Sequence, residues 1–199
     1  MSEAGDGYPK SITLADGAEI RIDRMTAADR DAVLGFAAGL SEEDMLFLRV
    51  DITQPAVVDN WMASLESGHT ASLAAFDGDG VLIGYATVHR DPAPWTRRVG
   101  ELRVNVNSQY RERGLGKHLI SEIFSLARSL GLRKLMANMT SDQHGAQAAF
   151  RRLGFVPEAL LADYVEDRKG VSRDLVMMSY DIDGHTDRLD ETVKIKGAG

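Results

Sequence analysis

Two kinds of hydrophobic pattern divide the chain into short elements. In some stretches apolar and polar residues alternate, as in strands with one buried face. In others, apolar residues recur three and four positions apart, as in amphipathic helices. Residues 70–76 and 81–89 are instead largely apolar, β-branched or aromatic, as in more fully buried strands. Together these patterns predict strands over residues 18–24, 70–76, 81–89, 99–106, 134–138 and 173–181, and helices over residues 26–40, 54–67, 114–130 and 142–152.

Turn-forming residues separate several of these elements. Residues 77–80, Asp-Gly-Asp-Gly, favour a hairpin between two strands. Gly68 and Gly131 are suited to end the helices that precede them. After Gly154 and Phe155 the chain is expected to turn back into one more strand. The mixed order of strands and helices predicts an α/β fold of the mixed α+β kind, in which helices flank a central, mixed and twisted sheet.

The length of the chain fits one domain. Its 199 residues are 44% hydrophobic, enough to form a real core. We expect one domain over residues 11–182, between a flexible N-terminus over residues 1–10 and a flexible tail over residues 183–199, because both ends are polar and lack periodicity. No apolar run approaches the roughly 18 residues that span a bilayer, so we expect a cytoplasmic protein without a membrane partner.

Composition excludes several kinds of chemistry. The chain has no cysteine, which rules out disulfides, thiolate metal sites and cysteine nucleophiles. Its five histidines lack the spacing of known metal-binding motifs, so no metal is expected. The formal net charge of -7 argues against nucleic acid as a partner. A phosphate-bearing ligand would therefore need a local positive patch.

Such a patch lies between the strand over residues 99–106 and the helix over residues 114–130. Here the sequence Arg-Glu-Arg-Gly-Leu-Gly-Lys, residues 111–117, places three cations against Glu112. A helix that begins at this point directs unpaired N–H groups and the positive end of its dipole at the loop, and glycines allow a ligand close to the backbone. The segment is therefore suited to bind a pyrophosphate.

Two common phosphate-binding motifs fit this segment poorly. A Walker loop needs four residues between its first glycine and the Gly-Lys pair, followed by Ser or Thr, whereas here one residue intervenes and His118 follows. The Rossmann fingerprint would need glycine at Leu119 and an early βαβ unit. Neither class of nucleotide-binding protein is indicated.

The segment closely resembles the core motif of the GNAT acetyltransferase superfamily. That motif is Arg or Gln, two residues, Gly, one residue, then Gly or Ala, and it corresponds here to Arg111, Gly114 and Gly116. A strand with the sequence VNV precedes it, an amphipathic helix follows, and AFRRLGF comes about forty residues later in the family's order. The resemblance covers residues 18–181. It implies the acyl-CoA N-acyltransferase fold and an enzyme that transfers acetyl from acetyl-CoA to an amine in a ternary complex, releasing coenzyme A.

The resemblance also implies which residues bind the cofactor. In the family, the strand before the motif bonds the pantetheine arm and the loop amides hold the pyrophosphate. The implied contacts are Val104, Asn105 and Val106 to pantetheine, residues Arg111, Glu112, Arg113, Gly114, Leu115, Gly116 and Lys117 to the phosphates, and Gln143 and Phe150 at the positions where the family has an asparagine and a tyrosine.

Glu101 is the candidate base. An acceptor ammonium must lose a proton before its nitrogen attacks, and a lysine with a pKa near 10.4 is neutral only about once in 2,500 at pH 7. Glu101 matches the glutamate of protein-lysine acetyltransferases in GELRVNV, and LFLRV at residues 46–50 is similar to the same subgroup. Glu101 as a solvated carboxylate paired with Arg103 or Arg98 is the alternative.

The sequence leaves alternatives for the general acid and for the acetyl acceptor. Phe150 lacks the hydroxyl that is thought to protonate the leaving thiolate in the family, and Tyr164 is a possible substitute or a partly buried aromatic residue. The acceptor is a protein lysine or a small amine such as an amino acid, polyamine or aminoglycoside, and a non-catalytic acyl-CoA-binding domain is a further alternative. The protein is expected to be a monomer or homodimer. Four acids favour a cationic acceptor or form a solvated face: Glu42, Glu43, Asp44 and Asp51.

Overall fold

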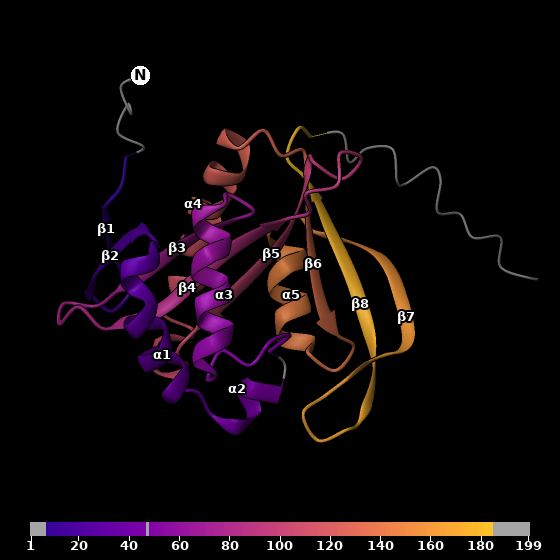
Figure 1. Cartoon of the computed structure of the whole chain (residues 1–199), viewed down its shortest axis with the longest axis horizontal. Helices are drawn as coiled ribbons and strands as arrows, with labels where there is room; N and C mark the ends of the chain where they lie inside the picture. Colours follow the sequence, from indigo (N-terminus) through magenta and orange to yellow (C-terminus); the bar gives the residue numbers. More distant parts are fainter. Residues whose placement is uncertain (1–6, 47, 185–199) are drawn as a thin grey trace, which may run out of the picture.

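The computed structural model describes residues 7–46 and 48–184 (Figure 1). The strands are β1 (Lys10–Thr13), β2 (Glu19–Arg24), β3 (Thr70–Phe76), β4 (Leu82–Arg90), β5 (Val99–Val106), β6 (Lys134–Thr140), β7 (Val156–Glu166) and β8 (Ser172–Asp181). The helices are α1 (Arg30–Ala38), α2 (Glu42–Leu46), α3 (Pro55–Glu66), α4 (Leu115–Ser129) and α5 (His144–Arg152), with 3-10 turns at Ala27–Asp29 and Ser108–Tyr110.

All eight strands form one sheet in the order β1-β2-β3-β4-β5-β6-β8-β7. Neighbouring strands run antiparallel except β5 and β6, which are parallel. The connection between these two strands contains α4, as a parallel crossover requires. The mixed sheet flanked by helices that the sequence predicts is therefore confirmed.

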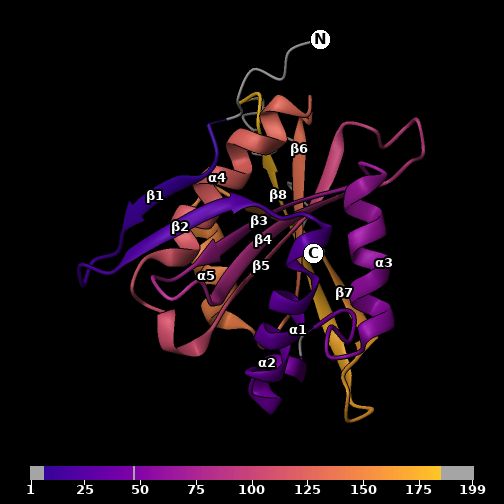
Figure 2. The same ribbon diagram turned by 60° about the vertical axis from the view of Figure 1, so that its left-hand side comes forward.

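Helices cover both faces of the sheet (Figure 2). On one face, α4 buries a stripe that includes Leu119 and Ile123 against β4 and β5, and α5 adds Phe150 at its margin. On the other face, α1 and α3 pack Val33 and Val58 against β3 and β4. Each helix buries its apolar stripe, which supplies most of the stability that short helices lack in isolation.

Gly100 lies at a tightly packed point of the sheet. A Cβ at this position would lie 2.5 Å from Cγ1 of Val88 and 2.8 Å from Cδ1 of Leu132. Only a residue without a side chain fits here, at the point where β5 joins β6.

The predicted elements agree with most of the structure. The helix expected over residues 26–40 begins with a 3-10 turn and continues as α1 to Ala38. The short elements β1 and α2 were not predicted, and the strand expected after Phe155 extends over eleven residues as β7. β1 begins at Lys10, at the edge of the segment predicted to be flexible. Residues 1–6 and 185–199 of the two predicted flexible ends lie outside the described residues.

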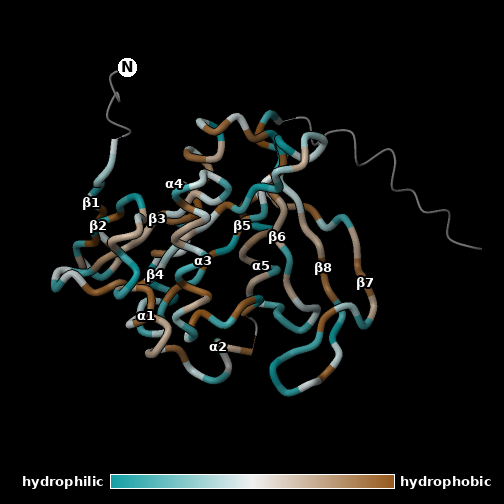
Figure 3. The backbone as a smooth tube through the Cα atoms, viewed as in Figure 1, coloured by the Kyte–Doolittle hydropathy of each residue, from teal (hydrophilic) through white to brown (hydrophobic). Residues whose placement is uncertain are grey.

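The hydropathy of the chain follows this architecture (Figure 3). The long turn between β7 and β8, at the lower right, is mainly hydrophilic. Among the residues that the structure describes, no helix has the length and apolar character needed to cross a membrane.

Candidate active site

A cleft opens where β5 and β6 separate. The two strands pair only from Val99 opposite Lys134 to Glu101 opposite Met136. Beyond this point β5 stays paired with β4, and β6 stays paired with β8. The cleft between them has a volume of about 1220 Å³ and is also lined by residues of α2, the α2–α3 connection, α5 and β7. Two strand edges without a common ladder therefore face a space large enough for an extended ligand.

The side chains of β5 alternate between the two faces of the sheet, as predicted. Glu101 and Asn105 lie on the face covered by α1 and α3, where they are opposite residues of β4. The amide nitrogen of Asn105 donates to the hydroxyl of Tyr85 at 2.7 Å. Burial raises the pKa of Tyr85 to about 12, so its hydroxyl stays protonated at neutral pH. Trp61 packs edge-on against the Tyr85 ring, with ring centroids 4.9 Å apart.

Two arginines hold Glu101. Nη1 of Arg49, in the α2–α3 connection, lies 2.6 Å from both carboxylate oxygens, and Nε and Nη2 of Arg103 each lie 3.1 Å from Oε1. Burial opposes ionisation of Glu101, but the two arginines outweigh burial and hold the pKa of the carboxyl below its ordinary value. Of the partners expected from the sequence, Arg103 is therefore confirmed, whereas Arg98 donates instead to the carbonyl of Gly131.

His89 is opposite Glu101 in the β4–β5 pair. Burial and the charge of Arg103 lower the pKa of His89 to about 4, so the imidazole is neutral at pH 7. Its Nδ1 lies 3.0 Å from the hydroxyl oxygen of Thr70. Glu101 therefore has no third cation from the neighbouring strand.

The glycine-rich loop turns sharply into α4. Gly114 has a φ of +95° and Glu112 a φ of +60°, both in the left-handed region. Within the described residues, no intramolecular hydrogen bond engages the backbone N–H groups of Glu112, Arg113 and Gly114. Nε of Arg113 is buried and also lacks a partner in the described part of the chain. Unpaired donors thus gather before the N-terminus of a fifteen-residue helix, an arrangement that suits an anion.

The side chains of this loop differ in their availability. Arg111 forms an ion pair with Asp44 of α2 and donates from Nε to the carbonyl of Val106 at 3.2 Å. Arg113 forms an ion pair with Asp16. Lys117 is exposed on the first turn of α4. Of the three cations only Arg111 lines the cleft, and both Arg111 and Arg113 have acidic partners.

The hydrophobic members of the predicted set take different places. Leu115 is fully buried in the core, so only its backbone can face a ligand. Gly116 is the second residue of α4 and lies beside Val106. Phe150 lines the cleft and packs edge-on against Phe155, with centroids 4.9 Å apart. The structure thus brings residues 104–106, Arg111 and Phe150 to one cleft.

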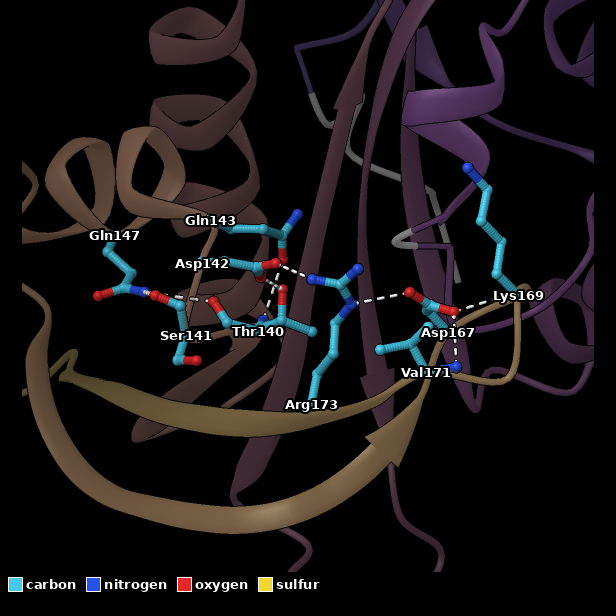
Figure 4. A network of polar contacts seen from close by, with 9 residues as sticks. All are labelled: Thr140, Ser141, Asp142, Gln143, Gln147, Asp167, Lys169, Val171 and Arg173. Carbon is cyan, nitrogen blue, oxygen red and sulfur yellow. Dashed lines mark hydrogen bonds and ion pairs between the residues drawn. The ribbon is translucent and has the colours of Figure 1, made fainter.

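The loop between β6 and α5 forms the opposite wall and is fixed by polar contacts (Figure 4). The side-chain oxygen of Gln143 accepts from the backbone N–H of Thr140 at 3.0 Å. Arg173 of β8 lies between Asp142 of this loop and Asp167 of the β7–β8 turn, and its Nε donates to Asp167 at 2.8 Å. The arginine therefore ties the β7–β8 turn to the wall that carries Gln143.

Sequence reasoning missed Arg49 and Tyr85 as parts of this cleft. Arg49 lies in LFLRV, a stretch that was noted for its resemblance and not for a contact with Glu101, and Tyr85 belongs to no motif. Each reaches the site through the fold. Tyr164, considered as a substitute acid, lines the cleft and is 64% exposed rather than partly buried. Asp44 and Asp51, two of the acids that favour a cationic acceptor or form a solvated face, are instead paired with Arg111 and Arg168. In the described residues no group of three His, Asp or Glu side chains could hold a metal.

The sequence was also compared with known protein families and proteins. The model of the acetyltransferase (GNAT) family matches residues 39–155. No curated protein sequence matches the chain significantly.

Several solved structures share the fold. A ribosomal-protein-alanine N-acetyltransferase from Brucella melitensis is 24% identical, with 80% of this chain and 98% of that chain covered and a TM-score of 0.71. The yncA acetyltransferase from Salmonella typhimurium, solved with acetyl-CoA, is 22% identical over 83% and 95% of the chains, also at 0.71. A phosphinothricin acetyltransferase from Sinorhizobium meliloti in complex with AcCoA is 20% identical over 85% and 89%, with a TM-score of 0.71.

Proposed function

The chain belongs to the acetyltransferase (GNAT) family, and from this premise we propose that it transfers the acetyl group of acetyl-CoA to a primary amine and releases coenzyme A. The observation that carries the proposal is the cleft between β5 and β6, which ends beside the unpaired N–H groups of the glycine-rich loop. A long ligand with an anionic group fits such a site, because the strand edges and the loop offer hydrogen bonds along its whole length.

The cofactor half of the site is assigned to residues of β5, the loop and α5. The N–H groups of residues 112–116 would hold the pyrophosphate, with Arg111 and Lys117 adding positive charge. Val104, Asn105 and Val106 would bond the pantetheine arm through their strand edge. Gln143 and Phe150 would line the opposite side of this arm.

The reaction forms a C–N bond and breaks a C–S bond. Acetyl-CoA supplies the acetyl group as a thioester. Glu101 would accept the proton that the acceptor nitrogen loses as it attacks the carbonyl carbon, and backbone N–H groups of β5 would stabilise the charge that develops on the carbonyl oxygen. Phe150 has no hydroxyl to donate, so the sulfur would leave as a thiolate or take its proton from water.

The charges around Glu101 determine its protonation state and its strength as a base. The two arginines keep its carboxylate ionised at neutral pH, so it is ready to accept a proton. The same arginines weaken it as a base, because protonation would leave two cations together. We therefore assign Glu101 a modest base contribution together with positioning of the amine, rather than a carboxyl poised near pH 7.

The acceptor is a primary amine on a protein or a small molecule. The similar solved structures are named for both kinds of acceptor, a ribosomal protein and phosphinothricin, so the shared fold favours neither. The resemblance of GELRVNV to protein-lysine acetyltransferases favours a lysine side chain. The pairing of Asp44 and Asp51 with arginines removes much of the negative charge that would attract one.

A screen of acceptors tests the proposal. The purified chain is mixed with acetyl-CoA and, separately, with lysine peptides, polyamines, aminoglycosides and amino acids, and free thiol is followed with time. Thiol release that depends on an amine supports acetyl transfer. If acetyl-CoA binds but no amine raises thiol release above background hydrolysis, the chain is an acyl-CoA-binding domain without turnover.

A further inference from the structure

Arg49, Glu101 and Arg103 form a cluster with one more positive than negative charge. A single carboxylate lies between the two guanidinium groups, at the end of the β5–β6 pairing where the cleft begins. Arg49 is 60% exposed, and its Nη1 serves both oxygens of Glu101. Within the described residues, neither Nε nor Nη2 of Arg49 nor Nη1 of Arg103 has a hydrogen-bond partner. The cluster therefore keeps donors for a second anion.

Other acids near the cleft do not cancel this charge. Among the described residues that line the cleft, Glu166 is the one acid without an ion-pair partner, and it is exposed to solvent at the end of β7. The remaining acids beside the cleft have arginine partners of their own: Asp44 with Arg111, Asp51 with Arg168, and both Asp142 and Asp167 with Arg173.

An unpaired acceptor lies across the cleft from this cluster. Met136 pairs with Glu101 in the β5–β6 ladder, and Asn138, two residues later, lies on the same face of the sheet. Oδ1 of Asn138 is buried, belongs to the cleft lining, and has no hydrogen-bond partner in the part of the chain described. A buried carbonyl oxygen in this state requires an N–H donor. The acceptor amine would supply one.

From these two features we infer that the acceptor is a small molecule in which a carboxylate or a similar oxyanion lies close to the primary amine. The inference rests on the proposed acetyl transfer and narrows its acceptor. The oxyanion binds the free donors of Arg49 and Arg103, in the bidentate manner that guanidinium groups favour. The amine lies between Glu101 and Asn138, with its nitrogen directed into the cleft.

The same charges disfavour a lysine side chain as the acceptor. A lysine carries its ammonium four methylene groups from the backbone and has no negative group beside it. Next to a cluster with surplus positive charge, such an ammonium is repelled unless the partner protein adds an acid at the right position. An amine with its own oxyanion needs no such addition.

Matched pairs of acceptors test the inference. The amino acids are each compared with their α-carboxamides, alongside a lysine peptide, by following free thiol with acetyl-CoA in excess. Proline is left out because its amine is secondary, and cysteine because its own thiol reacts in the assay. We expect at least one amino acid to exceed its carboxamide and the peptide about tenfold or more in kcat/KM, since one bidentate charged contact is lost in each competitor. Equal values for acid and carboxamide in every pair, or a faster lysine peptide, would overturn the inference while leaving acetyl transfer in place.

Variants of Arg49 provide the second arm. Arg49→Gln should raise KM for the preferred acid about tenfold and change KM for its carboxamide much less, and Arg49→Lys should recover only part of the loss because it lacks the planar fork. Arg97→Gln, which removes an exposed arginine outside the cleft, is the matched control. Equal effects of Arg49→Gln on acid and carboxamide would refute the contact. Absence of thiol release with every amine would refute the proposed function, and this inference with it.

Discussion

Replacement of Glu101 by glutamine is the sharpest test of the catalytic assignment. The change keeps the size of the side chain and can still accept hydrogen bonds from Arg49 and Arg103, but it removes the negative charge between them. It leaves the glycine-rich loop and residues 104–106 untouched. We therefore expect acetyl-CoA to bind as in the wild type while turnover falls.

The size of the fall follows from the surroundings of Glu101. A positioned base contributes about 10²- to 10⁴-fold to the rate. Because the arginines hold the pKa of Glu101 below its ordinary value, proton transfer to it has a small driving force, and we expect the low end of that range. A hundredfold loss corresponds to about 2.7 kcal/mol at 1.36 kcal/mol per tenfold change.

The pH dependence adds a second, independent signature. Glu101 stays ionised throughout the neutral range, so the rise in the wild-type rate with pH comes from deprotonation of the amine. An amine needs less help from a base as the pH rises towards the pKa of the amine itself, which is near 10.4 for a lysine side chain. The ratio of wild-type to Glu101→Gln rates should therefore be largest near pH 7 and decrease towards pH 10.

The assay combines thiol release with calorimetric titration of acetyl-CoA. Glu166→Gln is the control, since it removes a carboxylate from the same cleft without touching the two arginines. Unchanged turnover in Glu101→Gln would remove Glu101 from the mechanism. A loss of equal size at every pH would show that the carboxylate positions the acceptor but takes no proton. Weaker acetyl-CoA binding would show that the variant disturbs the cofactor half.

Three further changes test the scaffold. Gly100→Ala should lower the free energy of unfolding by about 1–3 kcal/mol, because its Cβ has no space beside β4, and urea denaturation measures the loss. Gly114→Ala should weaken acetyl-CoA binding in a titration, because a φ of +95° is strained for alanine. Thr53 and Arg168 hold the pKa of Asp51 at about 2. Their contacts with the Asp51 carboxylate therefore stabilise the folded state above about pH 4, and this contribution is lost as the pH falls towards 2. Asp51→Asn should reduce this acid sensitivity in thermal melts, and an unchanged pH profile would contradict it.

The strongest local patterns predicted their elements closely. The strands expected over residues 70–76 and 99–106 coincide with β3 and β5, and the helix expected over residues 114–130 differs from α4 by one residue at each end. Residues 99–106 alternate, residues 114–130 carry a continuous apolar stripe, and residues 70–76 are largely apolar or β-branched and mostly buried. The cofactor loop could be predicted from the sequence for a similar reason, because its glycines and cations are adjacent along the chain.

Elements that depend on distant contacts were not predictable in this way. β1 has four residues and exists through its pairing with β2, in which Lys10 is opposite Ile22. β7 lies at the edge of the sheet and has an irregular burial pattern with two register shifts. Arg49 contacts a carboxylate 52 residues away, and no spacing in the chain indicates that contact. The acceptor half of the cleft is therefore a product of the tertiary fold.

The short pairing of β5 with β6 has a consequence for how the domain holds together. Five strands lie on one side of this seam and three on the other, and the ladder across it joins only three residue pairs. A molecule that bonds both open edges acts as an inserted strand and completes the sheet. Binding of the cosubstrate in the seam is then coupled to folding. Every tenfold rise in cosubstrate concentration above its dissociation constant raises the free energy of unfolding by about 1.4 kcal/mol. The domain would therefore be most stable when its cosubstrate is bound.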